Sequence, residues 1–178
     1  MEEQDMKLLP KALVLMCVGA LALSFAVPVM AGPVSDTAPV RPATSPLLGT
    51  WALDTSRLPM PPQQRPDSVK FTFADAGESK LSVRVDIVYA PGNEAHSASV
   101  ATLDGMAVSI KDSPEADTAS FKRPAPNVLV MALQKEGVLV STRVYAVLTD
   151  EQHLVETTVY PGNDGPLVMK TSYFTRIR

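Results

Sequence analysis

The chain has few of the residues that form disulfide bonds or bind metal ions. It has one cysteine, Cys17, and two histidines, His96 and His153, among 178 residues. A disulfide needs two cysteines and a zinc site usually needs three or four ligands, so the sequence predicts neither a disulfide framework nor a metal site. Aromatic residues make up 6% of the chain, too few for a surface on which nucleic-acid bases stack.

Basic residues are not in excess either. The chain has 16 Lys and Arg residues against 19 Asp and Glu residues, which gives a net charge of −3. A nucleic-acid-binding protein needs a basic face, and a membrane surface attracts blocks of basic residues; the sequence has neither. We therefore expect no nucleic-acid partner.

The first 31 residues have the composition of a secretory signal peptide. Lys7 and Lys11 form a short basic start, residues 12–27 are almost wholly apolar, and Ala31 is a small residue at the expected cleavage site. The apolar stretch is shorter than the roughly 20 residues that cross a bilayer. We expect cleavage after Ala31 and export to the periplasm or the cell exterior, with an uncleaved anchor as the alternative. Acidic residues are unusual in such a leader, so Met6, which follows them, is an alternative initiator.

The leader also holds the cysteine. A lipoprotein signal would make Cys17 the lipidated residue, but Met16 precedes it where a small residue is expected. Removal of the signal peptide, residues 1–31, leaves a chain without cysteine that is still long enough to bury a core. Residues 32–46 are rich in Pro, Ser, Thr and Ala and predict a disordered linker. We place one folded domain at residues 47–178.

Nine turn signals divide this domain into short runs rich in Val, Leu, Thr, Phe and Tyr. Most neighbouring turns are roughly 8 to 15 residues apart, the spacing typical of a meander, a barrel or a sandwich. Apolar and polar residues alternate within the runs, most clearly over residues 81–89, and this period of two indicates β-strands. The predicted strands are 48–55, 68–75, 80–90, 95–103, 105–111, 117–123, 127–134, 138–148, 152–160 and 167–177.

A cluster of prolines separates the first two predicted strands, at Pro59, Pro61, Pro62 and Pro66. Proline removes a donor from the strand ladder, so this stretch is predicted to be a loop. It is long beside the other turns, and we interpret it as a flap over one end of the sheet.

Short connections make strands that follow one another in the sequence neighbours in space. Ten antiparallel strands in one open sheet would leave two long edges, and closing the sheet removes them. The sequence therefore predicts an all-β fold, an antiparallel up-and-down meander closed into a barrel of eight to ten strands. Such a barrel has room inside for side chains or for one small ligand.

The first and last predicted strands carry a further signal. Gly49-Thr50-Trp51 lies on the first strand and Arg176 lies on the last. This pair resembles the lipocalin-like (calycin) barrels, in which a G-x-W motif lies at the closed end and an arginine from the last strand packs across the tryptophan. The resemblance implies that Gly49, Trp51 and Arg176 close the barrel. A guanidinium over an indole contributes about 0.5–2 kcal/mol.

A closer resemblance covers nearly the whole domain. It is to exported bacterial lipocalin-like proteins of unassigned function, and it rests on the order and spacing of the following motifs: Gly49-Thr50-Trp51, Asp104-Gly105, Pro114-Glu115-Ala116-Asp117-Thr118, Lys122-Arg123 and Phe174-Thr175-Arg176. The chain departs from that pattern at Leu103 and Met106, where Tyr and Lys are expected. It departs again at residues 150–152, where an Asp-Gly hairpin is expected. The resemblance implies a fold and no particular activity.

Three charged residues, Arg84, Arg143 and Lys170, lie in the middle of predicted strands. In one interpretation they point into the barrel and bind a carboxylate headgroup, as in fatty-acid carriers. In the other they lie on the solvent face with their stems along the sheet. Alternation with valine neighbours favours the solvent face for Arg84 and Arg143.

The tyrosines and methionines of the domain either line a ligand cavity or belong to an ordinary core, and the second is the more frequent case. With the arginines, they supply the residues that we consider for ligand binding. These candidates are Arg84, Tyr89, Met131, Arg143, Tyr145, Met169 and Tyr173.

Two functions fit this sequence better than catalysis does. The first is an exported lipocalin-like protein that binds a small apolar or amphipathic molecule, which predicts a cavity of roughly 300 Å³ or more. The second is an envelope structural or protein-interaction module with a filled barrel and no ligand. No strand–turn–helix elbow supports a Ser-His-Asp triad, so we expect neither catalysis nor a cofactor.

Overall fold

The computed structural model describes residues 44–162 and 165–178. The predicted signal peptide, its cysteine and most of the predicted linker lie outside the described residues. The sequence predicts that the domain starts at Leu47. This residue is 1% exposed and belongs to the packed core.

Strands make up most of the described chain, with two short 3₁₀ turns, Thr55–Arg57 and Pro62–Gln64, inside the proline-rich loop. In chain order the strands are β1 (Gly49–Leu53), β2 (Ser68–Asp75), β3 (Lys80–Ala90), β4 (Asn93–Thr102), β5 (Asp104–Ser109), β6 (Thr118–Ala125), β7 (Val128–Lys135), β8 (Val138–Val147), β9 (His153–Tyr160) and β10 (Val168–Ile177). Among these described residues, no helix is long and apolar enough to span a membrane.

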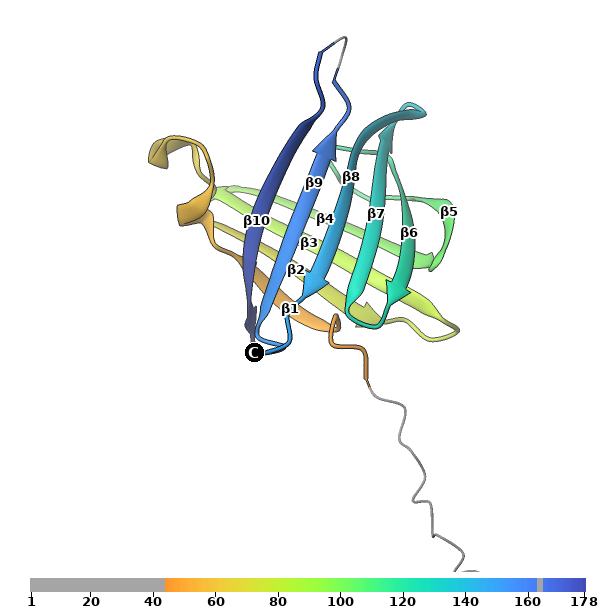
Figure 1. The fold of residues 1–178 in the computed structure, drawn as a ribbon. Helices are drawn as coiled ribbons and strands as arrows, with labels where there is room; N and C mark the ends of the chain where they lie inside the picture. The colour runs from red at the N-terminus through yellow and green to blue at the C-terminus, as the bar shows by residue number, and fades with distance from the viewer. Residues whose placement is uncertain (1–43, 163–164) are drawn as a thin grey trace, which may run out of the picture. The chain divides into compact units, whose positions relative to one another are not determined.

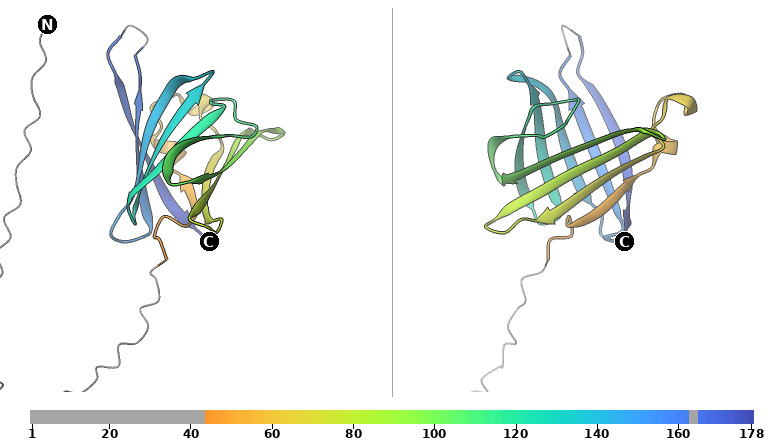
Figure 2. Two further views of the ribbon diagram at one scale, coloured as in Figure 1. Left: turned by 90° about the vertical axis from the view of Figure 1, so that its right-hand side faces the viewer. Right: turned by 180° about the vertical axis from the view of Figure 1, so that it is seen from behind.

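All ten strands belong to one antiparallel sheet in the order β4-β3-β2-β1-β10-β9-β8-β7-β6-β5. The sheet curls into a nearly closed barrel in which β1–β4 cross behind β6–β10 (Figures 1 and 2). The first and last strands pair directly, with Trp51 opposite Arg176. The predicted meander barrel is confirmed, and the described residues form ten strands.

The alternation that predicted the strands also decides which side chains fill the barrel. On β2, Val69, Phe71 and Phe73 are buried while the residues between them are more exposed. On β3, Leu81 and Val83 are buried in the same way. Successive side chains of a strand point to opposite faces, so one face of every strand supplies the interior.

The barrel closes weakly between β4 and β5, although these strands follow one another in the sequence. In place of a continuous ladder, the described residues join the two ends of the sheet through a bridge between Ala98 and Lys111. Its two hydrogen bonds run from Lys111 N to Ala98 O at 2.9 Å and from Ala98 N to Lys111 O at 3.3 Å. Strands β4 and β5 are therefore neighbours in space, as the short connection predicts, but they do not form a ladder with each other.

The side chain of Asp104 holds the turn that leads from β4 into β5. The Asp104 carboxylate accepts a hydrogen bond from Met106 N at 2.8 Å, and Gly105 has a φ of 90°. The pairing of β5 with β6 is irregular between Asp104 and Ala107. A side-chain acceptor thus satisfies a backbone donor where the β5–β6 ladder is interrupted.

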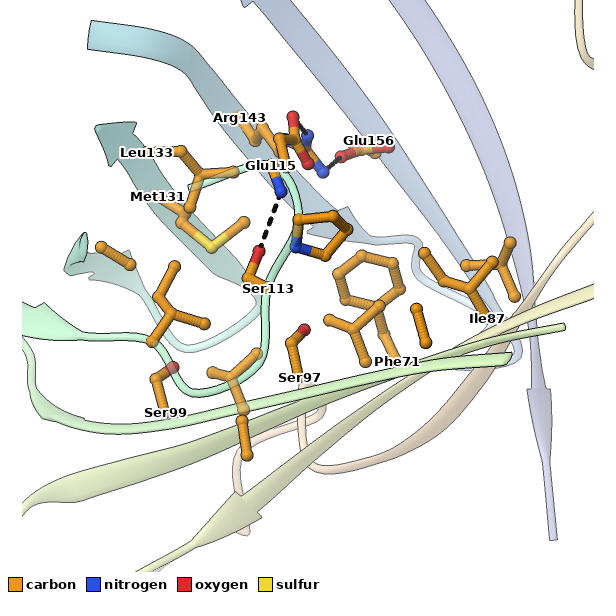
Figure 3. Close-up of a pocket in the computed structure, with 18 of the residues that line it drawn as sticks. Phe71, Ile87, Ser97, Ser99, Ser113, Glu115, Met131, Leu133, Arg143 and Glu156 are labelled. Atoms are coloured by element: carbon orange, nitrogen blue, oxygen red, sulfur yellow. Dashed lines mark hydrogen bonds and ion pairs between the residues drawn. The ribbon is translucent and has the colours of Figure 1, made fainter. Parts of the chain in front are cut away.

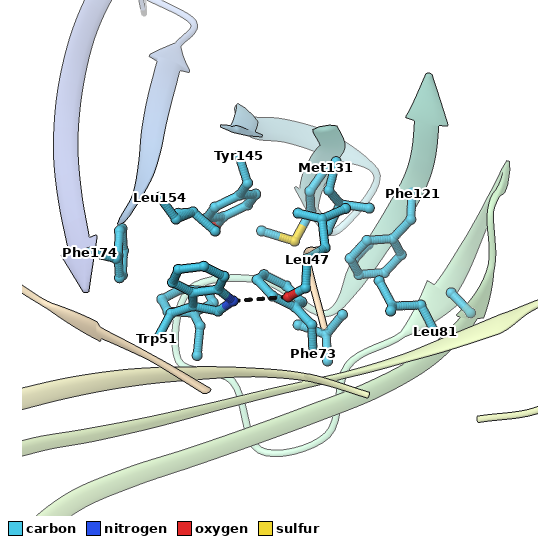
Figure 4. Close-up of a cluster of buried hydrophobic side chains, with 14 of the residues drawn as sticks. Leu47, Trp51, Phe73, Leu81, Phe121, Met131, Tyr145, Leu154 and Phe174 are labelled. Carbon is cyan, nitrogen blue, oxygen red and sulfur yellow. Dashed lines mark hydrogen bonds between the residues drawn. The ribbon is translucent and has the colours of Figure 1, made fainter. Parts of the chain in front are cut away.

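One end of the barrel is filled with large side chains around Trp51 (Figure 4). Trp51 is fully buried, and its indole Nε1 donates a hydrogen bond to Leu47 O at 2.9 Å. The rings of Phe71 and Phe174 meet edge to face, with 5.5 Å between their centroids. This closed end leaves the remaining interior volume to the opposite end.

Arg176 caps the closed end from the last strand. Its guanidinium lies 4.1 Å from the centroid of the Trp51 ring. It also donates three hydrogen bonds to backbone carbonyls, to Leu48 O at 2.7 Å, Pro46 O at 2.5 Å and Glu151 O at 2.7 Å. Trp51 and Arg176, which the resemblance to lipocalin-like barrels predicts to pack together, are therefore in contact.

Gly49 makes room for this arginine. Its φ of 132° is rare for other residues, and a Cβ at this position would collide with Nη1 of Arg176. The first position of the G-x-W motif is thus explained by the arginine that lies across it.

We predict that Arg176→Met lowers the free energy of unfolding by about 2 kcal/mol or more, because it leaves partly buried carbonyls unpaired and removes the contact with Trp51. Urea denaturation measures this change. Arg178→Met removes the same charge from an exposed neighbour on the same strand end and is the matched control. Equal stability of the two variants would contradict this role for Arg176.

Candidate functional site

The end of the barrel opposite Trp51 contains a cavity of about 220 Å³. Most of its wall is apolar, and β3 and β4 supply the most residues, followed by β2, β6 and β7. The apolar lining includes Val69, Phe71, Val83, Val85, Ile87, Phe121, Met131, Leu133 and Phe174. The cavity is smaller than the roughly 300 Å³ expected for a ligand carrier.

Small residues on β4 leave much of this space open. Ala95, Ser97 and Ser99 occupy alternate positions on the inward face of β4 and line the cavity. They face a wall of valine, phenylalanine and leucine side chains from other strands. A strand with larger residues at these positions would fill the same volume.

The loop between β5 and β6 covers the cavity (Figure 3). Ser113, Pro114 and Glu115 line it, and Ser113 Oγ accepts hydrogen bonds at 3.3 Å from the backbone N–H groups of Glu115 and Ala116. Lys135 Nζ on β7 donates to Pro114 O at 3.2 Å. This segment, and not the proline-rich loop after β1, covers the interior, since no residue of 54–67 lines the cavity.

A group of three charged side chains forms the charged part of the wall. Arg143 projects from the middle of β8 with 12% of its side chain exposed, and its Nη2 is ion-paired with Glu115 Oε1. Its Nη1 lies 3.6 Å from Oε1 of Glu156 on β9, and its Nε donates to Ser141 Oγ at 3.3 Å. Loop and sheet are thus joined by the arginine that lines the cavity.

Two buried oxygen atoms beside this group have no hydrogen-bond partner among the described residues. They are Glu156 Oε1 and the hydroxyl of Tyr145. Glu156 is 5% exposed, Tyr145 is fully buried, and the two residues lie directly opposite each other in the β8–β9 ladder. Because buried polar groups are nearly always paired, the Glu156 oxygen, which belongs to a residue of the cavity wall, indicates a place for a further hydrogen-bond donor.

The electrostatics of the group follow from its burial. Burial raises the pKa of the Tyr145 phenol well above its usual value, and the nearby Glu156 carboxylate raises it further. Burial alone would lower the pKa of Arg143, but Tyr145, Glu115 and Glu156 outweigh it and hold the pKa above its usual range. Tyr145 therefore keeps its proton and Arg143 keeps its charge at neutral pH.

Three of the seven candidate ligand-binding residues line the cavity: Tyr89, Met131 and Arg143. The preference for the solvent face, drawn from alternation with valine, is wrong for Arg143. Strand β8 carries β-branched residues on its outer face, where they favour an extended backbone, while Ser141, Tyr145 and Val147 are the buried ones.

The other four candidates do not line it. Arg84 lies on the outer face of β3, where its Nε donates to Asp86 Oδ1 at 3.0 Å. Tyr145 belongs to the core below the cavity, and Met169 is 67% exposed. Tyr173 has the Arg57 guanidinium 3.5 Å from its ring centroid. On β10 the inward face is that of Phe174, which turns Met169 and Tyr173 outward.

Several residues of the site were not among the candidates. Glu156 shares one face of β9 with the buried Leu154 and Thr158, and this pattern places it on the inner face of the strand. Ser97 and Ser99 share the inner face of β4 in the same way. Glu115 lies in a loop, where no periodic signal shows its direction.

A second cluster of polar residues lies outside the barrel, on β3 and β4. His96 Nδ1 lies 2.6 Å from Asp86 Oδ1, and its Nε2 lies 3.3 Å from Glu94 Oε2. The hydrogen bond with Asp86 is the largest factor that raises the pKa of His96 above its usual 6.5. Within residues 44–162 and 165–178, no three His, Cys, Asp or Glu side chains are grouped so as to hold a metal ion.

The fold of this chain is similar to that of several solved proteins. No family model matches the sequence, and no curated protein matches it. A point variant of the fluorescent protein UnaG superposes with a TM-score of 0.51 at 14% identity, over 75% of this chain and 97% of that chain. Wild-type UnaG gives 0.50 at 14% identity, over 73% and 96%. A fatty acid binding protein of Schistosoma mansoni, solved with arachidonic acid, gives 0.48 at 14% identity, over 76% and 98%.

At this identity the similarity to UnaG shows a shared architecture. With the ten-stranded, nearly closed antiparallel barrel and the contact between Trp51 and Arg176, it shows that the chain has the lipocalin-like fold.

We predict that Arg143→Met lowers the free energy of unfolding by about 3 kcal/mol, because it leaves the buried Glu156 carboxylate without its cation. The double variant Arg143→Met/Glu156→Leu should recover most of this loss, since the uncompensated charge is removed as well. Chemical denaturation of both variants measures the difference. A double variant no more stable than Arg143→Met would contradict this account.

The outer cluster predicts a pH dependence. His96 has a raised pKa in the folded state, so its contribution to stability is present below about pH 6.5 and is lost as the pH rises through the folded-state pKa. We expect His96→Gln to destabilise the protein at about pH 5.5 and to have little effect at about pH 8.5. Urea denaturation at both pH values tests this. In an Asp86→Asn background the difference between the two pH values should shrink, and an unchanged difference would exclude the pair as its source.

Proposed function

We propose that this protein is an exported binding protein that holds a small apolar or amphipathic molecule inside its barrel, without catalysing a reaction. The observation that carries the proposal is the cavity of about 220 Å³, whose wall is mostly apolar and contains one charged group of Arg143, Glu115 and Glu156. A concave apolar wall with a few convergent polar groups is the usual form of a ligand site.

The size of the cavity limits the ligand. A volume of about 220 Å³ lies below the range of roughly 300–1,000 Å³ for drug-sized ligands, so the ligand is a short-chain or single-ring molecule. The export part of the proposal rests on the leader-like composition of the first 31 residues.

The small volume also favours the second candidate, an envelope structural or protein-interaction module without a ligand. Several large apolar residues lie exposed on the outer surface, among them Met106, Val138, Leu167 and Met169. In that case the interior charges would serve only to hold the β5–β6 loop. Binding measurements separate the two functions.

The test places a larger side chain on β4, the wall of the cavity that carries small residues. Ser97→Leu adds an isobutyl group where β4 lines the cavity, and it should weaken the binding of octan-1-ol, measured by calorimetry, by at least about tenfold. Its stability should change little, because the added group enters space that is empty.

Ser82→Leu is the matched control, since Ser82 lies on β3 with its side chain on the outer face, opposite Val100. It should leave octan-1-ol binding unchanged. If the wild-type protein does not bind octan-1-ol or a comparable short apolar molecule, or if both variants bind as the wild type does, the barrel interior is not the binding site and the interaction module becomes the better function.

A further inference from the structure

The charges in the cavity wall do not balance. Arg143 supplies one positive charge, while Glu115 and Glu156 supply two negative charges, all within the group described above. Among the described residues that line the cavity, these three are the charged ones. The polar part of the cavity therefore has a net negative charge.

Arg143 has little capacity left for a further anion. Its Nη2 is ion-paired with Glu115, its Nε donates to Ser141 Oγ, and its Nη1 faces Glu156. A ligand carboxylate would have to displace Glu115 and the loop that carries it, and it would add a third negative charge beside Glu156. Like charges in a partly desolvated site disfavour this arrangement.

The Glu156 carboxylate has an acceptor atom that calls for a donor. Its Oε1 is buried without a hydrogen-bond partner among the described residues, and Glu156 lines the cavity. Arg143 Nη1 lies 3.6 Å from this oxygen, beyond hydrogen-bond distance. A bound group with N–H bonds and a positive charge would pair with this oxygen and neutralise the excess negative charge (Figure 3).

We propose that the ligand carries an amine, held as an ammonium against Glu156, on a short apolar body that fills the rest of the cavity. This inference rests on the proposed function and specifies the class of ligand. Arg143 then acts as the counter-charge that keeps Glu115 and the β5–β6 loop in place, and it does not act as the anchor for the ligand.

Three probes with the same chain and different heads test the proposal on the purified wild-type protein. They are octylamine, octan-1-ol and octanoate, titrated by calorimetry at neutral pH and below their aggregation limits. Octylamine should bind at least about tenfold more tightly than octanoate, with octan-1-ol between them.

Glu156→Gln shows whether the preference comes from this carboxylate. The amide keeps the shape of the side chain and removes the charge, so octylamine should bind about tenfold more weakly while octan-1-ol changes by less than about twofold. Glu136→Gln is the matched control, because Glu136 is exposed in the turn between β7 and β8, and it should not alter the order of the three probes. The octan-1-ol affinity also shows that each variant is folded with its cavity open.

The outcomes distinguish a failure of the amine assignment from a failure of the proposed function. If all three probes bind but octanoate binds as tightly as octylamine or more tightly, the amine assignment is wrong and the proposed function stands. If octylamine is preferred equally by wild type and Glu156→Gln, the site of recognition is wrong. If no probe binds, the proposed function fails and the amine assignment fails with it.

Discussion

The whole barrel depends on one guanidinium. Arg176 packs over Trp51 and donates hydrogen bonds to carbonyls of residues 46, 48 and 151. These carbonyls come from the start of the chain's folded part and from the turn between β8 and β9. One planar group with fixed donors thus holds both ends of a long meander together, a task that a lysine, with a single rotating ammonium, could not perform with the same geometry. The large side chains packed at this end leave the free volume at the other.

Two kinds of residue shape the cavity, small side chains on one wall and charged side chains on another. Small side chains on β4 leave space, and a charged group at the cavity wall fixes the loop that covers it. Burying Arg143 and Glu156 carries a large desolvation cost, and replacing such groups by apolar residues of similar volume often stabilises a protein. Their presence in a mostly apolar interior is therefore better explained by recognition than by stability, which agrees with the Glu156 oxygen left without a hydrogen-bond partner in a residue of the cavity wall.

Sequence reasoning located the strands well because the period of two is strong in runs such as residues 81–89, where every inward position is apolar. It misjudged Arg143 because β8 carries apolar residues on both faces, so that alternation alone did not show which face is buried. No local pattern marks the weak join of β4 and β5, which the described chain makes through the bridge between Ala98 and Lys111. The position of Glu115 over the cavity depends on contacts between residues far apart in the sequence, which no local pattern encodes.

The barrel is less stable against local opening between β4 and β5 than between its other strands. Elsewhere its strands are linked by ladders of several residue pairs, whereas here the described chain is linked by two hydrogen bonds at Ala98 and Lys111. Breaking these two hydrogen bonds would cost far less free energy than separating any full ladder. The barrel can therefore open locally between β4 and β5 while its nine ladders stay intact. Backbone amides on either side should be the first of the strand amides to exchange with solvent, and the adjoining loop that covers the cavity would move with them.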